Sequence, residues 1–216
     1  AVEAIKKNVD NESNLAKVVN QFKVAIANSI FDQMQRHFVI TPLGYLKPNV
    51  LPFSGIVDQH LTELDGFGRI DFRDTVKPSF VRKFIFTGFL KSYYTECKFD
   101  SKTELDFANM LESDNDVLRW LRPASNQFNI YWANGAKRYE PDFIVETSDC
   151  IYMIETKALK DISDEDVQAK KKAAEEYCKN ATEYTSKNGG KPWRYHLLRH
   201  DVVERSNSFE YLMALS

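Results

Sequence analysis

The chain has 216 residues, of which 43% are hydrophobic and 28% are charged, and its formal net charge is −2. This composition is ordinary for a soluble globular protein. It excludes a basic field over the whole molecule, so composition alone does not indicate a nucleic-acid partner. The sequence contains three cysteines without a C-x-x-C pair and no apolar run of about 18 residues. Its first residues lack the basic and apolar regions that are typical of a signal peptide. We therefore expect a cytoplasmic protein without a disulfide framework and without a membrane partner.

Residues 1–83 carry the pattern of a mainly helical extension. In NLAKVVNQFKVAIANSIFDQMQRHF, apolar residues recur every three or four positions, which predicts an amphipathic helix that stops near Thr41-Pro42. The following TPLGYLKPNVLPFSGIVD has three prolines and two glycines and predicts a connector with little regular structure. Because the first residue is Ala and the opening stretch resembles the middle of a helix, we expect a piece of a larger protein. Removal of an initiator Met is the alternative that would look the same.

From about residue 80 the sequence combines strand and helix patterns. RKFIFTGFLK has strand character, and FDSKTELDFANMLESDNDVLRWL predicts a helix with Ser101 as N-cap and Glu104 three residues later. QFNIYWANGAKRYEPDFIVETSDCIYMIETKA then contains three strand-like runs, the first two separated by Asn134-Gly135 and the last two by Ser148-Asp149.

A long polar helix follows, from about Asp164 to Ser186 with Ser163 as its cap, and WRYHLLRHDVV returns as a strand. The order is helix, three strands, helix, strand. We therefore predict an α/β fold with a mixed central sheet flanked by helices, preceded by the helical extension.

Charged residues stand at the ends of two of these apolar runs. Residues two apart on a strand point to the same face, so Glu155 and Lys157 share the face of Ile151 and Met153. Asp142 starts the preceding strand. An antiparallel hairpin brings the start of that strand beside the end of the next, so we expect these three charged side chains to converge at one edge of the sheet.

Two convergent carboxylates repel each other unless a cation lies between them or one of them is protonated. Carboxylate oxygens suit a hard ion such as Mg²⁺, which can polarise a phosphodiester and activate a water molecule. A lysine beside that ion can orient or deprotonate the water, or neutralise the charge that develops on the phosphate. The combination predicts phosphodiester hydrolysis.

These residues carry a family resemblance. Pro141-Asp142 followed by Glu155-Thr156-Lys157 resembles the PD-(D/E)xK nuclease signature, and the order of elements resembles the core of that superfamily. FTGFLKSYYTECKFDSKTELDFANMLESD, YEPDFIVET, YMIETKA and GKPWRYHLL resemble the endonuclease domain that ends the restriction subunit of Type III restriction-modification enzymes. The likeness covers about residues 84–200, so we assign residues 84–216 to the endonuclease domain and residues 1–83 to a link to a helicase motor.

The resemblance implies Mg²⁺-dependent cleavage of double-stranded DNA, with Mn²⁺ as a substitute metal. It implies that Asp142 and Glu155 are metal ligands and that Lys157 is the catalytic base or an electrostatic stabiliser. It further suggests Glu104 and the backbone carbonyl of Thr156 as additional ligands. Its partners would be the helicase motor of the same parent chain, through which alone ATP would act, and the subunits for modification and target recognition.

Simpler structural roles remain open for each of these side chains. Glu155 and Lys157 could form an exposed cross-strand ion pair, and Asp142 could accept backbone hydrogen bonds after the proline. Glu104 could serve the capping box alone. We interpret Gln168 and the lysines that follow it, at 170–172, as a solvated helix face rather than as groups that contact the site or DNA.

Two other functions also remain open. One is a non-catalytic DNA-binding or docking module with the same fold, because the overall charge is close to neutral and the chain has no target-reading motif. The other is the nuclease domain of a different helicase–nuclease for phage defence or repair. No Walker motif occurs in the chain, so coupling to ATP cannot reside in it.

Overall fold

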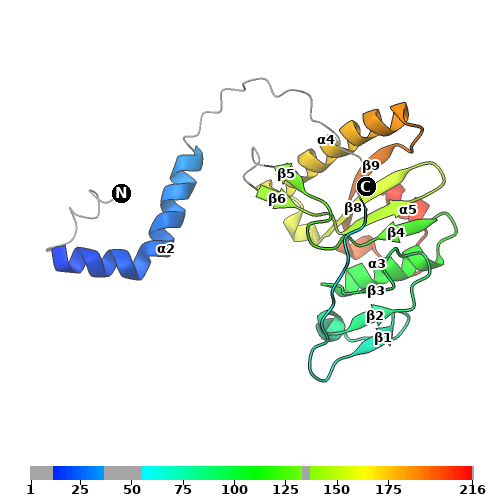
Figure 1. The fold of residues 1–216 in the computed structure, drawn as a ribbon, viewed down its shortest axis with the longest axis horizontal. Helices are drawn as coiled ribbons and strands as arrows, with labels where there is room; N and C mark the ends of the chain where they lie inside the picture. Colours follow the sequence, from blue (N-terminus) through cyan, green and yellow to red (C-terminus); the bar gives the residue numbers. More distant parts are fainter. Residues whose placement is uncertain (1–11, 37–54, 133–136, 216) are drawn as a thin grey trace. The chain divides into compact units, whose positions relative to one another are not determined.

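The computed structural model describes residues 12–36, 55–132 and 137–215. The chain divides into two compact units, residues 1–48 and 49–216 (Figure 1). In the first unit, helix α2 spans Glu12–Arg36, as the apolar spacing predicted, and Phe22 interrupts it with non-helical dihedral angles. The predicted stop at Thr41-Pro42 lies outside the described residues. None of the helices in the described ranges combines the length and the apolar character that a bilayer-crossing helix needs.

The second unit opens with a small three-stranded sheet. Its strands are β1 (Arg69–Asp71), β2 (Ile85–Thr87) and β3 (Glu96–Cys97). β1 is parallel to β2, and β2 is antiparallel to β3. β2 confirms the strand that RKFIFTGFLK predicted. This packed unit therefore includes residues that we had assigned to the extension. The role of residues 1–83 as a link to a motor stays a prediction.

A second sheet, of four strands, forms the centre of the unit, in the order β4-β7-β8-β9. β8 is antiparallel to β7 and parallel to β9, and β7 is antiparallel to β4, so the sheet is mixed. The strands of this sheet are β4 (Arg119–Leu121), β7 (Phe143–Glu146), β8 (Ile151–Lys157) and β9 (Trp193–Arg199).

The predicted helix over residues 99–121 is too long, because its last three residues form strand β4. Helix α3 covers only Lys102–Ser113, with Ser101 as its N-cap as predicted. The chain then turns at Asp114, whose side-chain Oδ1 accepts from the Asp116 N–H at 2.8 Å. Asp and Asn favour such turns because their side chains bond to the backbone two residues on. After the turn the chain has strand geometry.

The strand-like runs before β8 also divide differently from the prediction. A separate two-stranded hairpin pairs β5 (Ile130–Trp132) with β6 (Lys137–Tyr139). The predicted turn at Asn134-Gly135 lies outside the described residues. The second predicted run splits at Pro141 into β6 and β7, because proline has no N–H to donate to a strand ladder. The turn at Ser148-Asp149 is confirmed, and the Thr147 N–H donates to the Cys150 carbonyl across it at 2.9 Å.

Two helices complete the unit. Helix α4 spans Glu165–Lys187, and α5 spans Phe209–Ala214. The N-cap of α4 is Asp164 rather than the predicted Ser163, because the Asp164 carboxylate accepts from the N–H groups of Asp166 and Val167.

The four-stranded sheet has a hydrophobic core on each face, with α3 and α4 on opposite sides (Figure 1). Phe143 and Val145 of β7 join the α3 core, and Ile144 between them joins the α4 core, as the alternation of side chains along a strand requires. The fold is therefore mixed α/β with a mixed central sheet, consistent with a restriction-endonuclease-like core. This confirms the predicted fold class.

Candidate active site

Glu155 and Lys157 stand at the C-terminal end of β8, on the α4 face of the sheet. Glu155 lies two residues beyond Met153, which belongs to the α4 core. Glu155 is only 6% exposed, and Lys157 beside it is half-buried. Lys157 Nζ forms an ion pair with Glu155 Oε1 at 2.6 Å. A pair buried to this extent differs from the exposed edge pair that we had considered as the simpler role.

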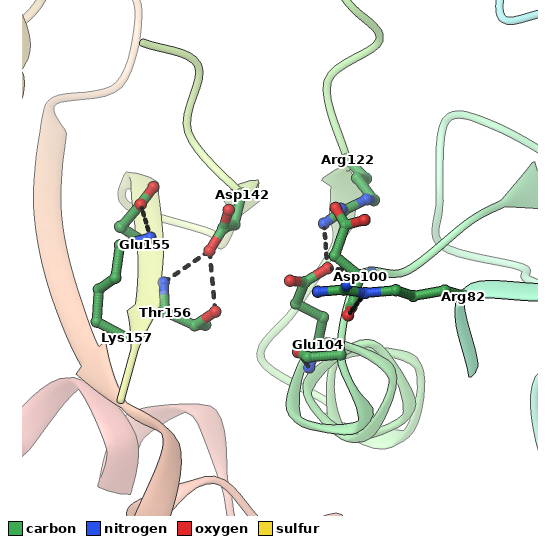
Figure 2. Close-up of polar contacts among 9 residues, drawn as sticks. Arg82, Asp100, Glu104, Arg122, Asp142, Glu155, Thr156 and Lys157 are labelled. Carbon is green, nitrogen blue, oxygen red and sulfur yellow. Dashed lines mark hydrogen bonds and ion pairs between the residues drawn. The ribbon is translucent and has the colours of Figure 1, made fainter. Parts of the chain in front are cut away.

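Asp142 immediately precedes β7, next to this strand end. The β7–β8 ladder ends where Phe143 pairs with Ile154, so Asp142 lies one residue before the ladder and close enough to Glu155 for its charge to raise the Glu155 pKa. The Asp142 carboxylate accepts two hydrogen bonds at Oδ2, from the backbone N–H of Thr156 at 2.8 Å and from the Thr156 hydroxyl at 2.9 Å. In Figure 2, Asp142 is drawn between the Glu155–Lys157 pair and the Glu104–Arg122 group.

Burial and charge act together on the two groups of the ion pair. Burial, and secondarily repulsion from Asp142, raise the pKa of Glu155 to about 7, although Lys157 opposes the shift. Burial lowers the pKa of Lys157, but attraction and hydrogen bonding to Glu155 outweigh this, so the Lys157 pKa is raised overall. The short distance between the two groups indicates an ion pair once Glu155 is ionised, with the ammonium charged throughout the physiological range.

One oxygen of the Glu155 carboxylate stands out. Glu155 Oε2 is buried, and none of the described residues donates a hydrogen bond to it. Buried carboxylate oxygens are almost always hydrogen-bonded or bound to a cation, because leaving one alone forfeits its hydration. Such an oxygen beside a second carboxylate fits a hard divalent cation.

The described residues do not supply a complete metal cage. No group of three or more His, Cys, Asp or Glu side chains within them is close enough to hold a metal ion. Asp142 and Glu155 therefore offer two carboxylates from neighbouring strands, and water would have to complete the shell. Mg²⁺ usually binds proteins in this manner, through one or two carboxylates and several waters.

Glu104 is buried on α3 and belongs to a different set of contacts. Its backbone N–H donates to Ser101 Oγ at 3.1 Å, and its Oε2 accepts from the Asp100 N–H at 3.0 Å. Oε2 also pairs with Arg122 Nη1 at 2.8 Å. Burial raises the Glu104 pKa, against the attraction of Arg122, and repulsion from Asp142 adds to the increase. Ser101 thus caps the helix as predicted, but the Glu104 carboxylate accepts from the N–H of Asp100, one residue before the N-cap, rather than from that of Ser101 as a capping box requires. Metal ligation by Glu104 stays a prediction.

Arg122 bonds to both Glu104 and Asp100. Its guanidinium bonds to Asp100 Oδ2 at 2.8 Å and lies over the rings of Phe99 and Phe143, at 5.5 Å and 5.7 Å from their centroids. Sequence reasoning missed Arg122, since nothing in its local pattern distinguishes it from a surface arginine.

Gln168 lies on the exposed side of α4 and donates to the Ile162 carbonyl at 2.6 Å. This contact closes the loop before the helix and agrees with our interpretation of Gln168 as a helix-surface residue. The lysines at positions 170–172 are half-buried or exposed. The positive charge of Lys170 opposes the rise in the Glu155 pKa.

Residues 90–189 match the model of a protein family described as "Endonuclease domain". The match supports a restriction-endonuclease-like nuclease domain. The matched segment of this nuclease domain contains α3, β7, β8 and α4, and with them the four residues Glu104, Asp142, Glu155 and Lys157. No curated protein and no solved structure matches the chain.

Proposed function

We propose that this nuclease domain is a metal-dependent endonuclease that cleaves phosphodiester bonds of double-stranded DNA, and that it forms the C-terminal part of a Type III restriction enzyme. The observation that carries the proposal is the buried Glu155 oxygen to which no described residue donates a hydrogen bond. It lies near Asp142 and Lys157, inside the segment that matches an endonuclease family. A buried carboxyl group with a perturbed pKa, with a second carboxylate and an ammonium beside it, is more typical of a catalytic site than of a structural ion pair.

Asp142 and Glu155 would hold Mg²⁺, or Mn²⁺ in its place, with the Thr156 backbone carbonyl as a further oxygen ligand. The ion would supply a polarised phosphodiester and a water molecule of lowered pKa. Asp142 accepts hydrogen bonds from Thr156, and one oxygen of Glu155 pairs with Lys157. The other oxygen of Glu155 receives no hydrogen bond from the part of the chain that the structure describes.

Lys157 would stabilise the negative charge of the reacting phosphate rather than act as a general base. In the metal-free chain its pKa is raised, so it is an ammonium at neutral pH, and an ammonium has no lone pair with which to accept a proton from water. An ammonium at the mouth of a half-buried site can orient the attacking water and stabilise the negative charge that develops on the phosphate. We therefore assign electrostatic stabilisation to Lys157.

The remaining partners follow from the family resemblance alone. They are double-stranded DNA, a helicase motor in the same parent chain through which ATP would act, and the modification and target-recognition subunits. The same domain would serve equally in another helicase–nuclease of defence or repair.

The test is nicking of supercoiled plasmid by the 216-residue chain, with Mg²⁺ and with Mn²⁺. Asp142→Asn and Lys157→Ala should each lower the nicking rate by about 100-fold or more, because each removes a charged group from the reacting centre. Lys160→Ala is the matched control, since Lys160 is an exposed lysine three residues from Lys157 and should leave the rate unchanged. Equal nicking by the wild type and the Asp142 variant would refute the proposal.

A non-catalytic DNA-binding or docking module is the second candidate. It is favoured by the commitment of Glu104 to Arg122 and by the lack, within the described residues, of a cluster of three ligating side chains. Calorimetric titration separates the two candidates if no nicking is seen. Mn²⁺ binding that disappears in Asp142→Asn would indicate a nuclease that requires its motor, whereas no binding in the wild type would favour the docking module.

A further inference from the structure

The contact between Thr156 and Asp142 joins the two strands that carry the candidate ligands. β7 begins at Phe143, which pairs with Ile154, so Thr156 lies beyond the last residue pair of the β7–β8 ladder. There the Asp142 carboxylate takes the place of a strand carbonyl and accepts the Thr156 N–H. The hydroxyl of the same residue adds a second donor to the same oxygen.

Two donors on one carboxylate oxygen fix the direction of the carboxylate. One donor belongs to the backbone, and the other to a β-branched side chain that is 3% exposed. Branching at Cβ restricts the rotation of a threonine side chain, so its hydroxyl is held where the strand places it. Figure 2 shows both bonds leading from Thr156 to Asp142, whereas Glu155 and Lys157 pair on the other side of the strand.

We propose that the Thr156 hydroxyl is a positioning group that orients the Asp142 carboxylate for metal binding. This inference rests on the proposed function, because it assigns Thr156 a role in the same site. Hydrogen bonds from outside the coordination sphere orient ligating carboxylates, and their loss weakens metal binding. The assignment concerns the side chain of Thr156 and is separate from any ligation by its backbone carbonyl.

The experiment is calorimetric titration of Mn²⁺ into the 216-residue chain and its variants. Thr156→Val keeps the shape of the side chain and the backbone N–H but removes the hydroxyl. It should weaken Mn²⁺ binding by about 10- to 100-fold, and Thr156→Ser, which restores the hydroxyl, should stay within about threefold of the wild type.

The matched control is Thr147→Val. Thr147 is 5% exposed and its hydroxyl bonds to Asp149 and Cys150 in the turn at the opposite end of β8. Both valine variants lose one buried hydroxyl of the same strand pair, so thermal unfolding without metal should show similar losses for the two. Only Thr156→Val should lose Mn²⁺ affinity. Thr156→Ala provides the same comparison if the valine variant does not fold.

The possible results separate the inference from the proposed function. Wild-type Mn²⁺ binding that Thr156→Val leaves unchanged would overturn the role of Thr156 and leave the metal site standing. Equal weakening in Thr156→Ser and Thr156→Val would overturn the role of the hydroxyl. No Mn²⁺ binding by the wild type would overturn the proposed metal site and this inference together.

Discussion

Burial and the nearby charge of Asp142 raise the pKa of Glu155 into the physiological pH range. Its pKa in the folded chain is about 7, against an ordinary value of 4.5. The folded chain therefore keeps this proton at pH values where the unfolded chain has lost it. Because the unfolded state then binds fewer protons, this group lowers the free energy of unfolding as the pH rises from about 4.5 through 7.

We predict that Glu155→Gln removes this part of the pH dependence. Between pH 5 and pH 8, with metal chelated, the wild type should lose on the order of 1–3 kcal/mol more stability than the variant. The measurement is urea denaturation at a series of pH values. Glu176→Gln, at an exposed position of α4, is the control and should follow the wild type. Parallel curves for the wild type and Glu155→Gln would show that the proton of Glu155 is not linked to folding.

Part of the site follows from residue-scale patterns and part does not. The period of two along a strand predicted that Glu155 and Lys157 share a face, and the structure confirms the shared face. The bond from the Thr156 hydroxyl to Asp142 could not be predicted, because it depends on which way one carboxylate turns at the end of a ladder. The partner of Glu104 lies 18 positions away at Arg122 and is set by the packing of the chain between them.

At the scale of the elements, the sequence prediction and the structure differ in which residue is the N-cap of α4. Both Ser163 and Asp164 are residue types that cap helices, and only the backbone conformation decides between them. In the structure the Asp164 carboxylate accepts from the Asp166 N–H at 2.8 Å and from the Val167 N–H at 3.4 Å. Its negative charge also lies at the positive end of the helix dipole.

We predict that Asp164→Ala lowers the free energy of unfolding by about 1 kcal/mol. Ser163→Ala should change it by less than about 0.5 kcal/mol, because Ser163 is exposed and lies outside the cap. Both values come from chemical denaturation of the variants. A larger loss in the Ser163 variant would place the cap where the sequence pattern had placed it.

Strand β4 shows why some elements escape sequence analysis. Its three residues, Arg119–Leu121, follow an apolar spacing that continues that of α3, so the pattern extends the helix through them. What ends the helix is the turn chemistry of Asp114, and what makes a strand of β4 is its pairing with β7, which is distant in the chain. Short strands of this kind depend on tertiary contacts more than on their own residues.

On the scale of the second unit, Trp120 joins β4 of the four-stranded sheet to the segment that connects β2 and β3 of the three-stranded sheet. The Trp120 N–H donates to the Lys91 carbonyl, and the Trp120 carbonyl accepts from the Tyr93 N–H, each at 3.0 Å. The indole N–H donates to Glu112 Oε1 at 2.7 Å. Glu112 also accepts from the backbone N–H groups of residues 90, 91 and 92, so one carboxylate of α3 holds both the connecting segment and β4.

We predict that Glu112→Ala lowers the free energy of unfolding by about 3 kcal/mol, since it leaves four donors without their acceptor. Glu112→Gln retains one acceptor oxygen and should lose about half as much. The measurement is urea denaturation followed by far-ultraviolet circular dichroism, with the exposed Glu176→Ala as the control. A loss in Glu112→Ala no larger than that of the control would mean that the joint is held by apolar packing alone.

The hairpin of β7 and β8 has a consequence for how the molecule acquires its site. Glu155 and Thr156 belong to β8 and Asp142 immediately precedes β7, and a tight turn joins these two strands. In contrast, β9 pairs with β8 only after the whole of α4. Closing a short loop loses less chain entropy than closing a long one, so contacts close in sequence form readily during folding. We expect the two carboxylates and the Thr156 hydroxyl to come together when the β7–β8 hairpin forms, before β9 pairs with β8.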